Sequence, residues 1–153
     1  MTRKARIQHP VAIFPEVMKA MQSMHATAAS ADLPAKTLEL CHLRASQING
    51  CSVCADMHGK GAKKIGETDE RLFTVAAWRD TPYFTDAERA ALELTEHMTR
   101  MADKDDPVPD RVWDEAARHF NERQLAALVV QISAINVWNR FNVSIRQVVG
   151  AMW

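Results

Sequence analysis

The residues with the clearest chemical potential lie together between positions 51 and 58. Cys51 and Cys54 are three positions apart, and His58 follows four positions later, so on a helix the three side chains share one face. An imidazole one turn from a thiol can accept its proton, and the thiolate is the reactive form of cysteine. A second thiol nearby can then close a disulfide. The segment therefore predicts thiol redox chemistry.

Asn49 and Gly50 stand directly before the first cysteine and predict how the thiols are positioned. Because an Asn-Gly pair suits the left-handed end of a helix, one helix should end there and the next should begin near Cys51. Unpaired backbone N–H groups and the helix dipole stabilise a thiolate in such a first turn. We expect Cys54 to be the attacking thiol because it lies one turn from His58, and Cys51 to be the resolving thiol.

A zinc site is the main alternative interpretation of the same residues. The chain supplies a Cys3His set of ligand types in Cys41, Cys51, Cys54 and His58. Ligands at i, i+3 and i+7 of one helix span roughly 10 Å of rise, which is too long for a single tetrahedral ion. Cys41 also lies on a separate predicted helix. Simple packing of cysteines as small apolar residues is the other alternative. We favour the redox pair and expect no metal and no other cofactor.

Two polar residues of the preceding segment have weaker signals. By spacing alone, Glu39 is typical of a solvated surface acid, although it would reach the thiols if its helix packs antiparallel to the cysteine helix. His42 is one turn from Glu39 and can pair with it. A thioredoxin-like fold would need strands on either side of the cysteines, and the surrounding pattern is helical instead.

The remaining sequence predicts an all-α fold. Glycine is scarce, with five residues in 153, and few segments show the alternation of a half-buried strand. We expect about seven helices in one domain covering residues 1–153, with its core at about 14–150. Apolar spacing and capping residues predict helices after Pro15, at about 35–47, at about 51–66, after Thr68, from Thr85 to about 101, at 110–119, at 122–140, and a shorter one after Asn142.

Composition excludes several functional classes. Acidic and basic residues balance at 19 each, so no net field attracts nucleic acid or an anionic membrane. We see no apolar run near the roughly 20 residues that span a bilayer and no signal peptide. Three cysteines at these spacings do not form a secreted disulfide framework. We therefore expect a cytoplasmic protein.

Several motifs together resemble the carboxymuconolactone decarboxylase superfamily, and within it the alkylhydroperoxidase AhpD-like branch. The motifs are Glu39-Leu40, residues 44–51 (RASQINGC), Cys54, and Asp56-Met57-His58, and the resemblance continues through residues 66–72, 77–79, 84–92 and 135–140. It implies an all-helical fold that assembles as homo-oligomers, commonly trimers or hexamers. It also implies thiol peroxidase activity.

The resemblance assigns roles to particular residues. It places a proton-relay site on Glu39, Cys51, Cys54 and His58, and so reverses the spacing-based reading of Glu39. The founding peroxidases have an inner histidine where this chain has Val53, so one relay element is absent here. That departure bears on peroxidase efficiency and on the electron donor. The decarboxylases of the superfamily generally lack the paired cysteines.

The sequence thus predicts a cofactor-free hydroperoxide reductase. An external dithiol of the lipoyl or thioredoxin type would reduce the disulfide after each cycle. Two alternatives stay open: a non-enzymatic redox-sensing oligomer in which the disulfide switches an interface, and an acid–base enzyme of the decarboxylase type acting on a small organic acid.

Overall fold

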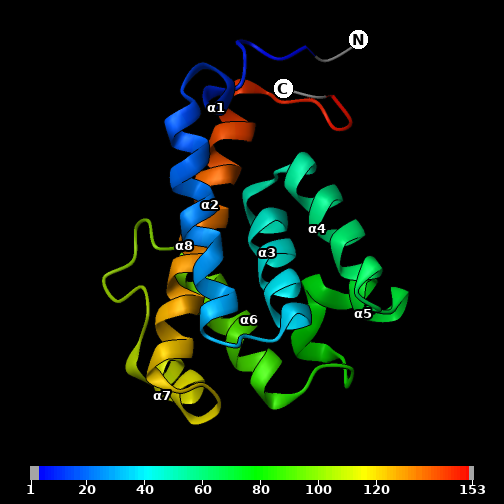
Figure 1. The fold of residues 1–153 in the computed structure, drawn as a ribbon. Helices are drawn as coiled ribbons and strands as arrows, with labels where there is room; N and C mark the ends of the chain where they lie inside the picture. The colour runs from blue at the N-terminus through cyan, green and yellow to red at the C-terminus, as the bar shows by residue number, and fades with distance from the viewer. Residues whose placement is uncertain (1–3, 152–153) are drawn as a thin grey trace.

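The computed structural model describes residues 4–151, and every regular element among them is helical (Figure 1). The elements are α1 (Pro10–Ile13), α2 (Pro15–Ser30), α3 (Ala35–Asn49), α4 (Ser52–Lys64), α5 (Asp69–Thr74), the 3₁₀ helix η1 (Val75–Asp80), α6 (Asp86–Thr99), α7 (Asp110–His119) and α8 (Glu122–Ile145). The predicted all-α fold is confirmed. Within residues 4–151, no helix combines the length and apolar character needed to cross a membrane.

Local capping signals account for most of the helix boundaries. Pro15 begins α2, where its missing N–H has no intrahelical partner to lose. Gly50 ends α3 in the left-handed region, at φ 66°. Thr85 and Asn121 each form a capping box, which satisfies N–H groups at the starts of α6 and α8. These boundaries agree with the sequence prediction because each depends on a few neighbouring residues.

The predicted end of the last long helix is wrong. The sequence indicated a helix to Arg140 and a separate one after Asn142, whereas α8 is continuous from Glu122 to Ile145. Polar residues do not break it, because several bond back to carbonyls one turn earlier. Asn142 Nδ2 donates to the Trp138 oxygen at 3.0 Å, and Arg140 donates to the Asn136 oxygen at 3.1 Å. Their polar groups are thereby satisfied inside a regular helix.

Two smaller differences concern short elements. The helix α1 has only four residues and was not predicted; the His9 side chain caps its start. The segment after Thr68 was predicted as one helix, but it divides into α5 and η1. Ala77 inside η1 has φ −116° and ψ 29°, which interrupts regular helical geometry.

The helix α3 lies at the centre of the packing. Figure 1 shows α2 beside α8, and α3 beside α4. Side chains of α3 enter three apolar clusters: Leu38 and Cys41 pack with α6, α7 and α8, Leu40 and Leu43 pack with η1 and α6, and Ala45 packs with α4 and α8. Because α3 is surrounded, its polar residues also face other helices. It can therefore carry several residues of one buried site.

A buried carboxylate, that of Glu96, links α3 to α6 and η1. Glu96 of α6 accepts hydrogen bonds from Arg44 Nε of α3 at 2.6 Å, from Trp78 Nε1 at 3.0 Å and from Arg79 Nη1 at 2.6 Å. Hydrogen-bonded pairing of this kind compensates the cost of removing a carboxylate from water. The pairing therefore anchors α3 to α6 and η1.

Candidate active site

The two predicted redox cysteines lie at the start of α4. Gly50 reverses the chain after α3, and Cys51 is the N-cap of α4, so the helix begins one residue later at Ser52. The Cys54 backbone N–H donates to Cys51 Sγ at 3.3 Å. Both residues are buried free thiols, with 2% and 0% of their surface exposed. The structure thus confirms the predicted helix break and brings both sulfurs to the N-terminus of α4.

The two thiols differ in acidity. The Cys54 thiol donates to Cys51 and lowers the pKa of Cys51 to about 7, against the opposing effect of burial; the backbone N–H groups of Cys54 and Val53 contribute as well. The hydrogen bond with Cys51 and burial both raise the pKa of Cys54. The pair therefore holds one proton on Cys54 and places the thiolate on Cys51. This order favours Cys51, whereas spacing from His58 favoured Cys54.

This arrangement predicts a titration that depends on both cysteines. We expect the ultraviolet absorbance of the Cys51 thiolate to titrate with a pKa of about 7 in the wild type. Cys54→Ala should raise that pKa because it removes the thiol that donates to Cys51. Cys41→Ala is the matched control, since burial raises the pKa of Cys41 to about 12. An unchanged midpoint in Cys54→Ala would show that the helix N-terminus alone holds the thiolate.

Glu39 and His58 form a hydrogen-bonded pair between neighbouring helices. His58 of α4 lies one turn after Cys54, and its Nδ1 is 2.9 Å from Oε2 of Glu39 on α3. The His58 side chain is largely buried and that of Glu39 is about one quarter exposed. A Cβ atom at Gly61 would stand 3.1 Å from Glu39 Oε2, so the glycine leaves room for the carboxylate. The carboxylate orients the imidazole, as the resemblance implied and as spacing alone did not.

His42 does not pair with Glu39 as the sequence indicated. Its ring lies with its centroid 4.7 Å from that of His58, and neither ring nitrogen has a hydrogen-bond partner within residues 4–151. Burial lowers the pKa of His42 well below its usual value, and the neighbouring His58 and His25 act in the same direction. His42 is therefore a neutral imidazole beside the Glu39–His58 pair.

Cys41 lies apart from the redox pair. It packs in the cluster of Leu38 and Leu94, whereas Cys51 and Cys54 pack with Ala45 and α8. The Cys3His zinc set considered from the sequence is therefore not brought together. Among the described residues, the group of side chains that could share a metal ion contains Glu39, His42 and His58 instead.

Asn142 contributes to the site and was not identified from the sequence. Its Nδ2 donates to Cys54 Sγ at 3.3 Å, and its side chain also hydrogen-bonds to His9. A signal existed in the spacing of Asn136, Asn139 and Asn142, three apart along an apolar helix. That spacing places all three amides on the face of α8 that meets α3 and α4.

The other amides of this face form a network that continues to α3. Asn49 Nδ2 donates to the side-chain oxygens of Asn136 at 2.9 Å and Asn139 at 2.8 Å, and Asn139 donates to Ser46 Oγ at 3.1 Å. Hydrogen bonding from Asn139 also lowers the pKa of both thiols. This amide network therefore forms part of the environment of both thiols.

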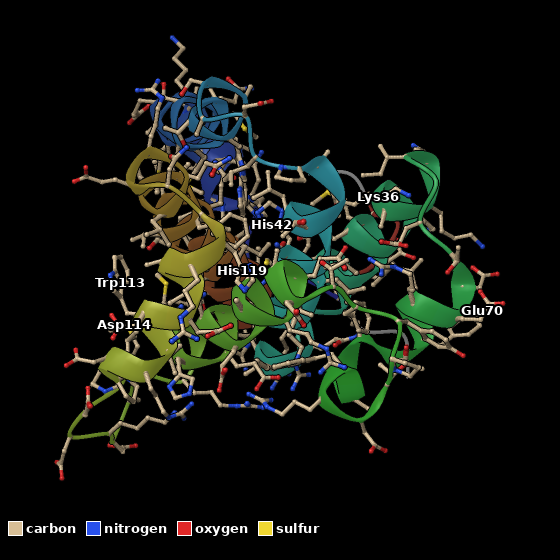
Figure 2. The ribbon with its side chains drawn as sticks, turned by 90° about the horizontal axis from the view of Figure 1, so that it is seen from below. Lys36, His42, Glu70, Trp113, Asp114 and His119 are labelled. Carbon is tan, nitrogen blue, oxygen red and sulfur yellow. The ribbon has the colours of Figure 1, made fainter. Side chains whose placement is uncertain are left out.

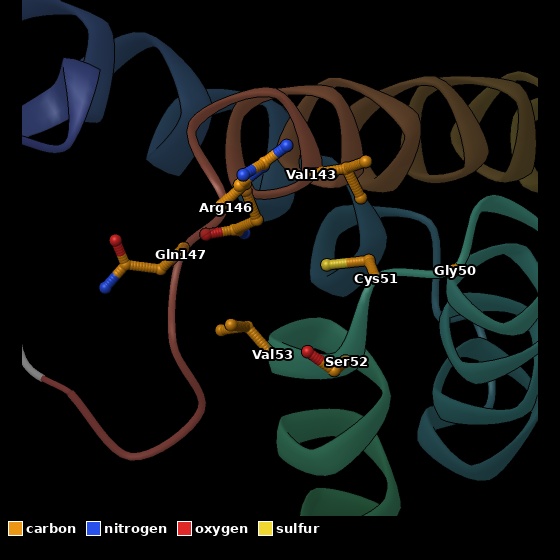
Figure 3. Close-up of a pocket in the computed structure, with 8 residues that line it drawn as sticks. Gly50, Cys51, Ser52, Val53, Val143, Arg146 and Gln147 are labelled. Carbon is orange, nitrogen blue, oxygen red and sulfur yellow. The ribbon is translucent and has the colours of Figure 1, made fainter. Parts of the chain in front are cut away.

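A small pocket gives access to Cys51. It has a volume of about 80 Å³ and is lined by residues that include Cys51, Val53, Asn142, Arg146 and Gln147. Figure 3 shows the Cys51 sulfur pointing into the space between the start of α4 and the chain that follows α8. Val53, at the position of the inner histidine of the founding peroxidases, adds an apolar wall. The volume exceeds that of a single water molecule, so a small chemical group fits beside the sulfur.

Comparisons with known proteins identify one matching protein family and one similar protein of nearly the same extent. The carboxymuconolactone decarboxylase family matches residues 15–97 of this chain. The uncharacterized protein YdfG of Bacillus subtilis (strain 168) is 39% identical over 132 residues, which cover 86% of this chain and 88% of YdfG.

Solved structures share the fold. ATU0492 from Agrobacterium tumefaciens, a protein of unknown function suggested to be the antioxidant defence protein AhpD, is 32% identical with a TM-score of 0.88, covering 97% of this chain and 100% of that one. The debrominase Bmp8 is 17% identical with a TM-score of 0.80, covering 92% of this chain and 75% of that one. At that identity the likeness to Bmp8 concerns the fold alone.

Proposed function

Because the chain belongs to the carboxymuconolactone decarboxylase family, in its AhpD-like branch, we propose that it is a thiol-dependent hydroperoxide reductase. One observation carries the proposal. A buried Cys51–Cys54 pair stands at the N-terminus of α4, and one turn later the same helix presents an imidazole held by Glu39. This combination provides a nucleophile, a second thiol and an imidazole that can relay a proton. The antioxidant role suggested for ATU0492 agrees with it.

The first step is attack on the peroxide by the more acidic thiol. The Cys51 thiolate attacks the distal oxygen of the hydroperoxide, the S–O bond forms and the O–O bond breaks. The departing alkoxide takes the proton of Cys54, whose thiol already donates toward Cys51. The products are a Cys51 sulfenic acid, an alcohol and a Cys54 thiolate. Asn142, a residue that lines the pocket, holds the Cys54 sulfur through its Nδ2.

The second step closes the disulfide. The Cys54 thiolate attacks the Cys51 sulfur, the S–S bond forms and the S–O bond breaks. The hydroxide that leaves becomes water by taking a proton that His58 relays from solvent. Glu39 keeps the imidazole in place for that transfer. An external dithiol then reduces the disulfide by exchange, which restores both thiols. A lipoyl or thioredoxin-type reductant fits this step. Assembly of the chain into a homo-oligomer stays a separate prediction.

The proposal is tested by steady-state consumption of hydroperoxides with a panel of dithiol donors. We expect turnover with at least one lipoyl or thioredoxin-type donor and with small alkyl hydroperoxides. Oxidation of one disulfide per chain without turnover under every donor, together with a change in oligomeric state, would support a redox sensor instead. Activity on a small organic acid that persists in Cys51→Ser/Cys54→Ser would support decarboxylase-type chemistry.

The Glu39–His58 pair predicts a specific kinetic defect. Glu39→Gln keeps the shape of the side chain but removes its negative charge, so it should lower kcat for peroxide turnover by about 100-fold. Pre-steady-state measurements should place the defect in disulfide closure, with sulfenic acid accumulating on Cys51. Glu115→Gln is the control because Glu115 lies on α7 in exposed pairs with Arg118 and His119. Full activity in Glu39→Gln would contradict the relay.

A further inference from the structure

Three side chains beside the thiol pair bring together the donor types of a metal centre. Each of Glu39, His42 and His58 offers a ligand atom, and these atoms lie within 4.8 Å of one another. Both histidines are buried, and the three residues come from the adjacent helices α3 and α4. We propose that they form a binding site for a divalent transition-metal ion, with Zn²⁺ the best match to two imidazoles and one carboxylate.

His42 is the observation that points to a ligand. The residue is 6% exposed, and both its ring nitrogens lack a hydrogen-bond partner within residues 4–151. A buried polar group without a partner costs about 1–3 kcal/mol, so such groups are rare in native proteins. Figure 2 labels His42 on α3 within the bundle, in contrast to Glu70 at its periphery. A coordinated ion would satisfy one of those nitrogens.

The geometry of the three residues suits a small ion after a modest closure. Ligand atoms around tetrahedral zinc, at bonds of about 2.0–2.1 Å, stand roughly 3.4 Å apart. Side-chain movements of the order of 1 Å would bring the three ligand atoms from their present spacing, within 4.8 Å, to the spacing that zinc requires. Gly61 leaves space beside the Glu39 carboxylate. The partly exposed Glu39 side chain provides a route of entry from the surface.

Binding of the ion and the proton relay exclude each other. In the metal-free arrangement Glu39 Oε2 and His58 Nδ1 hold a hydrogen between them at 2.9 Å. A metal bound to this pair replaces that hydrogen, because both ligands must present lone pairs to the ion. If the chain is the hydroperoxide reductase proposed above, zinc therefore withdraws His58 from the proton transfer that accompanies disulfide closure. That consequence rests on the proposed function, whereas the site itself does not.

The site is tested in a variant without the redox thiols. In full-length Cys51→Ser/Cys54→Ser, we expect one Zn²⁺ per chain by competition with a chromophoric chelator. Co²⁺ should give the visible ligand-field bands of a site with nitrogen and oxygen donors. Adding His42→Ala should weaken zinc binding by at least about 100-fold, since even outer-shell changes cost 10–100-fold. His119→Ala is the matched control and should leave the affinity unchanged.

The remaining outcomes are also decisive. Because the thiol-free protein cannot turn over peroxide, zinc binding here succeeds or fails independently of the proposed function. Thermal melting shows whether His42→Ala folds, and if it does not, Glu39→Gln in the same background must show the loss of zinc affinity. Zinc that binds the thiol-free protein equally well with and without His42 would overturn the site, as would binding that disappears when only the thiols are replaced.

Discussion

Replacing Cys51 with serine is expected to abolish peroxide turnover, with a loss of at least about 1,000-fold in kcat/KM. The serine hydroxyl stays protonated where the thiol has a pKa of about 7, so no nucleophile faces the pocket. Steady-state assays with the best dithiol donor measure the loss. Cys41→Ser is the control, because Cys41 lies in a separate apolar cluster and should be dispensable for turnover.

The order of the two thiols is decided by single turnover. Cys54→Ser should still consume one equivalent of peroxide and stop at a Cys51 sulfenic acid, which a sulfenate-specific nucleophile traps for mass spectrometry. Its rate should fall, because the Cys54 thiol no longer lowers the pKa of Cys51. Rapid sulfenic acid formation on Cys54 in Cys51→Ser would instead support the assignment made from the spacing between Cys54 and His58.

The second large effect concerns stability. Glu96→Ala should lower the free energy of unfolding by about 3–5 kcal/mol, because it leaves the largely buried Arg44 without its carboxylate and also removes the acceptor of Trp78. Urea denaturation followed by tryptophan fluorescence measures the change. Glu115→Ala, which removes an exposed carboxylate, should change stability by no more than about 0.5 kcal/mol. Equal effects in the two variants would contradict the structural role of Glu96.

The same carboxylate gives stability a defined pH dependence. Burial alone would raise the pKa of Glu96, but hydrogen bonds from Arg79, Arg44 and Trp78 outweigh it and lower the pKa to about 2. A depressed pKa stabilises the folded state above the ordinary value of 4.5, and that contribution is lost as pH falls from there through about 2. Urea titrations across this range should show a shallower loss of stability in Glu96→Ala than in the wild type.

The features that were predictable from the sequence depend on short segments. Gly50 ends a helix because it occupies the left-handed region, and Thr85 and Asn121 begin helices because their side chains satisfy nearby N–H groups. The position of the cysteine pair at a helix start followed from the Asn49-Gly50 pair. Each of these interactions joins residues within three or four positions of one another, so it can be recognised from the sequence.

The features that were missed depend on which helices meet. Spacing could not place Glu39 beside His58, since their contact requires α3 and α4 to pack together; the family resemblance supplied it. Asn142 reaches Cys54 across 88 positions of sequence. His42 makes no hydrogen bond to Glu39, although ligand atoms of the two side chains lie within 4.8 Å of each other. The continuity of α8 was missed because its internal polar residues look like a terminus when their partners are unknown.

The capping role of Cys51 makes the local stability of α4 depend on redox state. In the reduced protein, the Cys51 sulfur accepts the Cys54 N–H and so holds the first turn of the helix together. A disulfide sulfur carries no charge and is a poor acceptor, so oxidation removes a cap whose counterparts are typically worth about 1 kcal/mol. The disulfide joins the N-cap to the third residue of the helix, so a covalent bond replaces that hydrogen bond in holding the first turn together. The N-terminus of α4 would therefore depend on a hydrogen bond in the reduced protein and on a covalent bond in the oxidised protein.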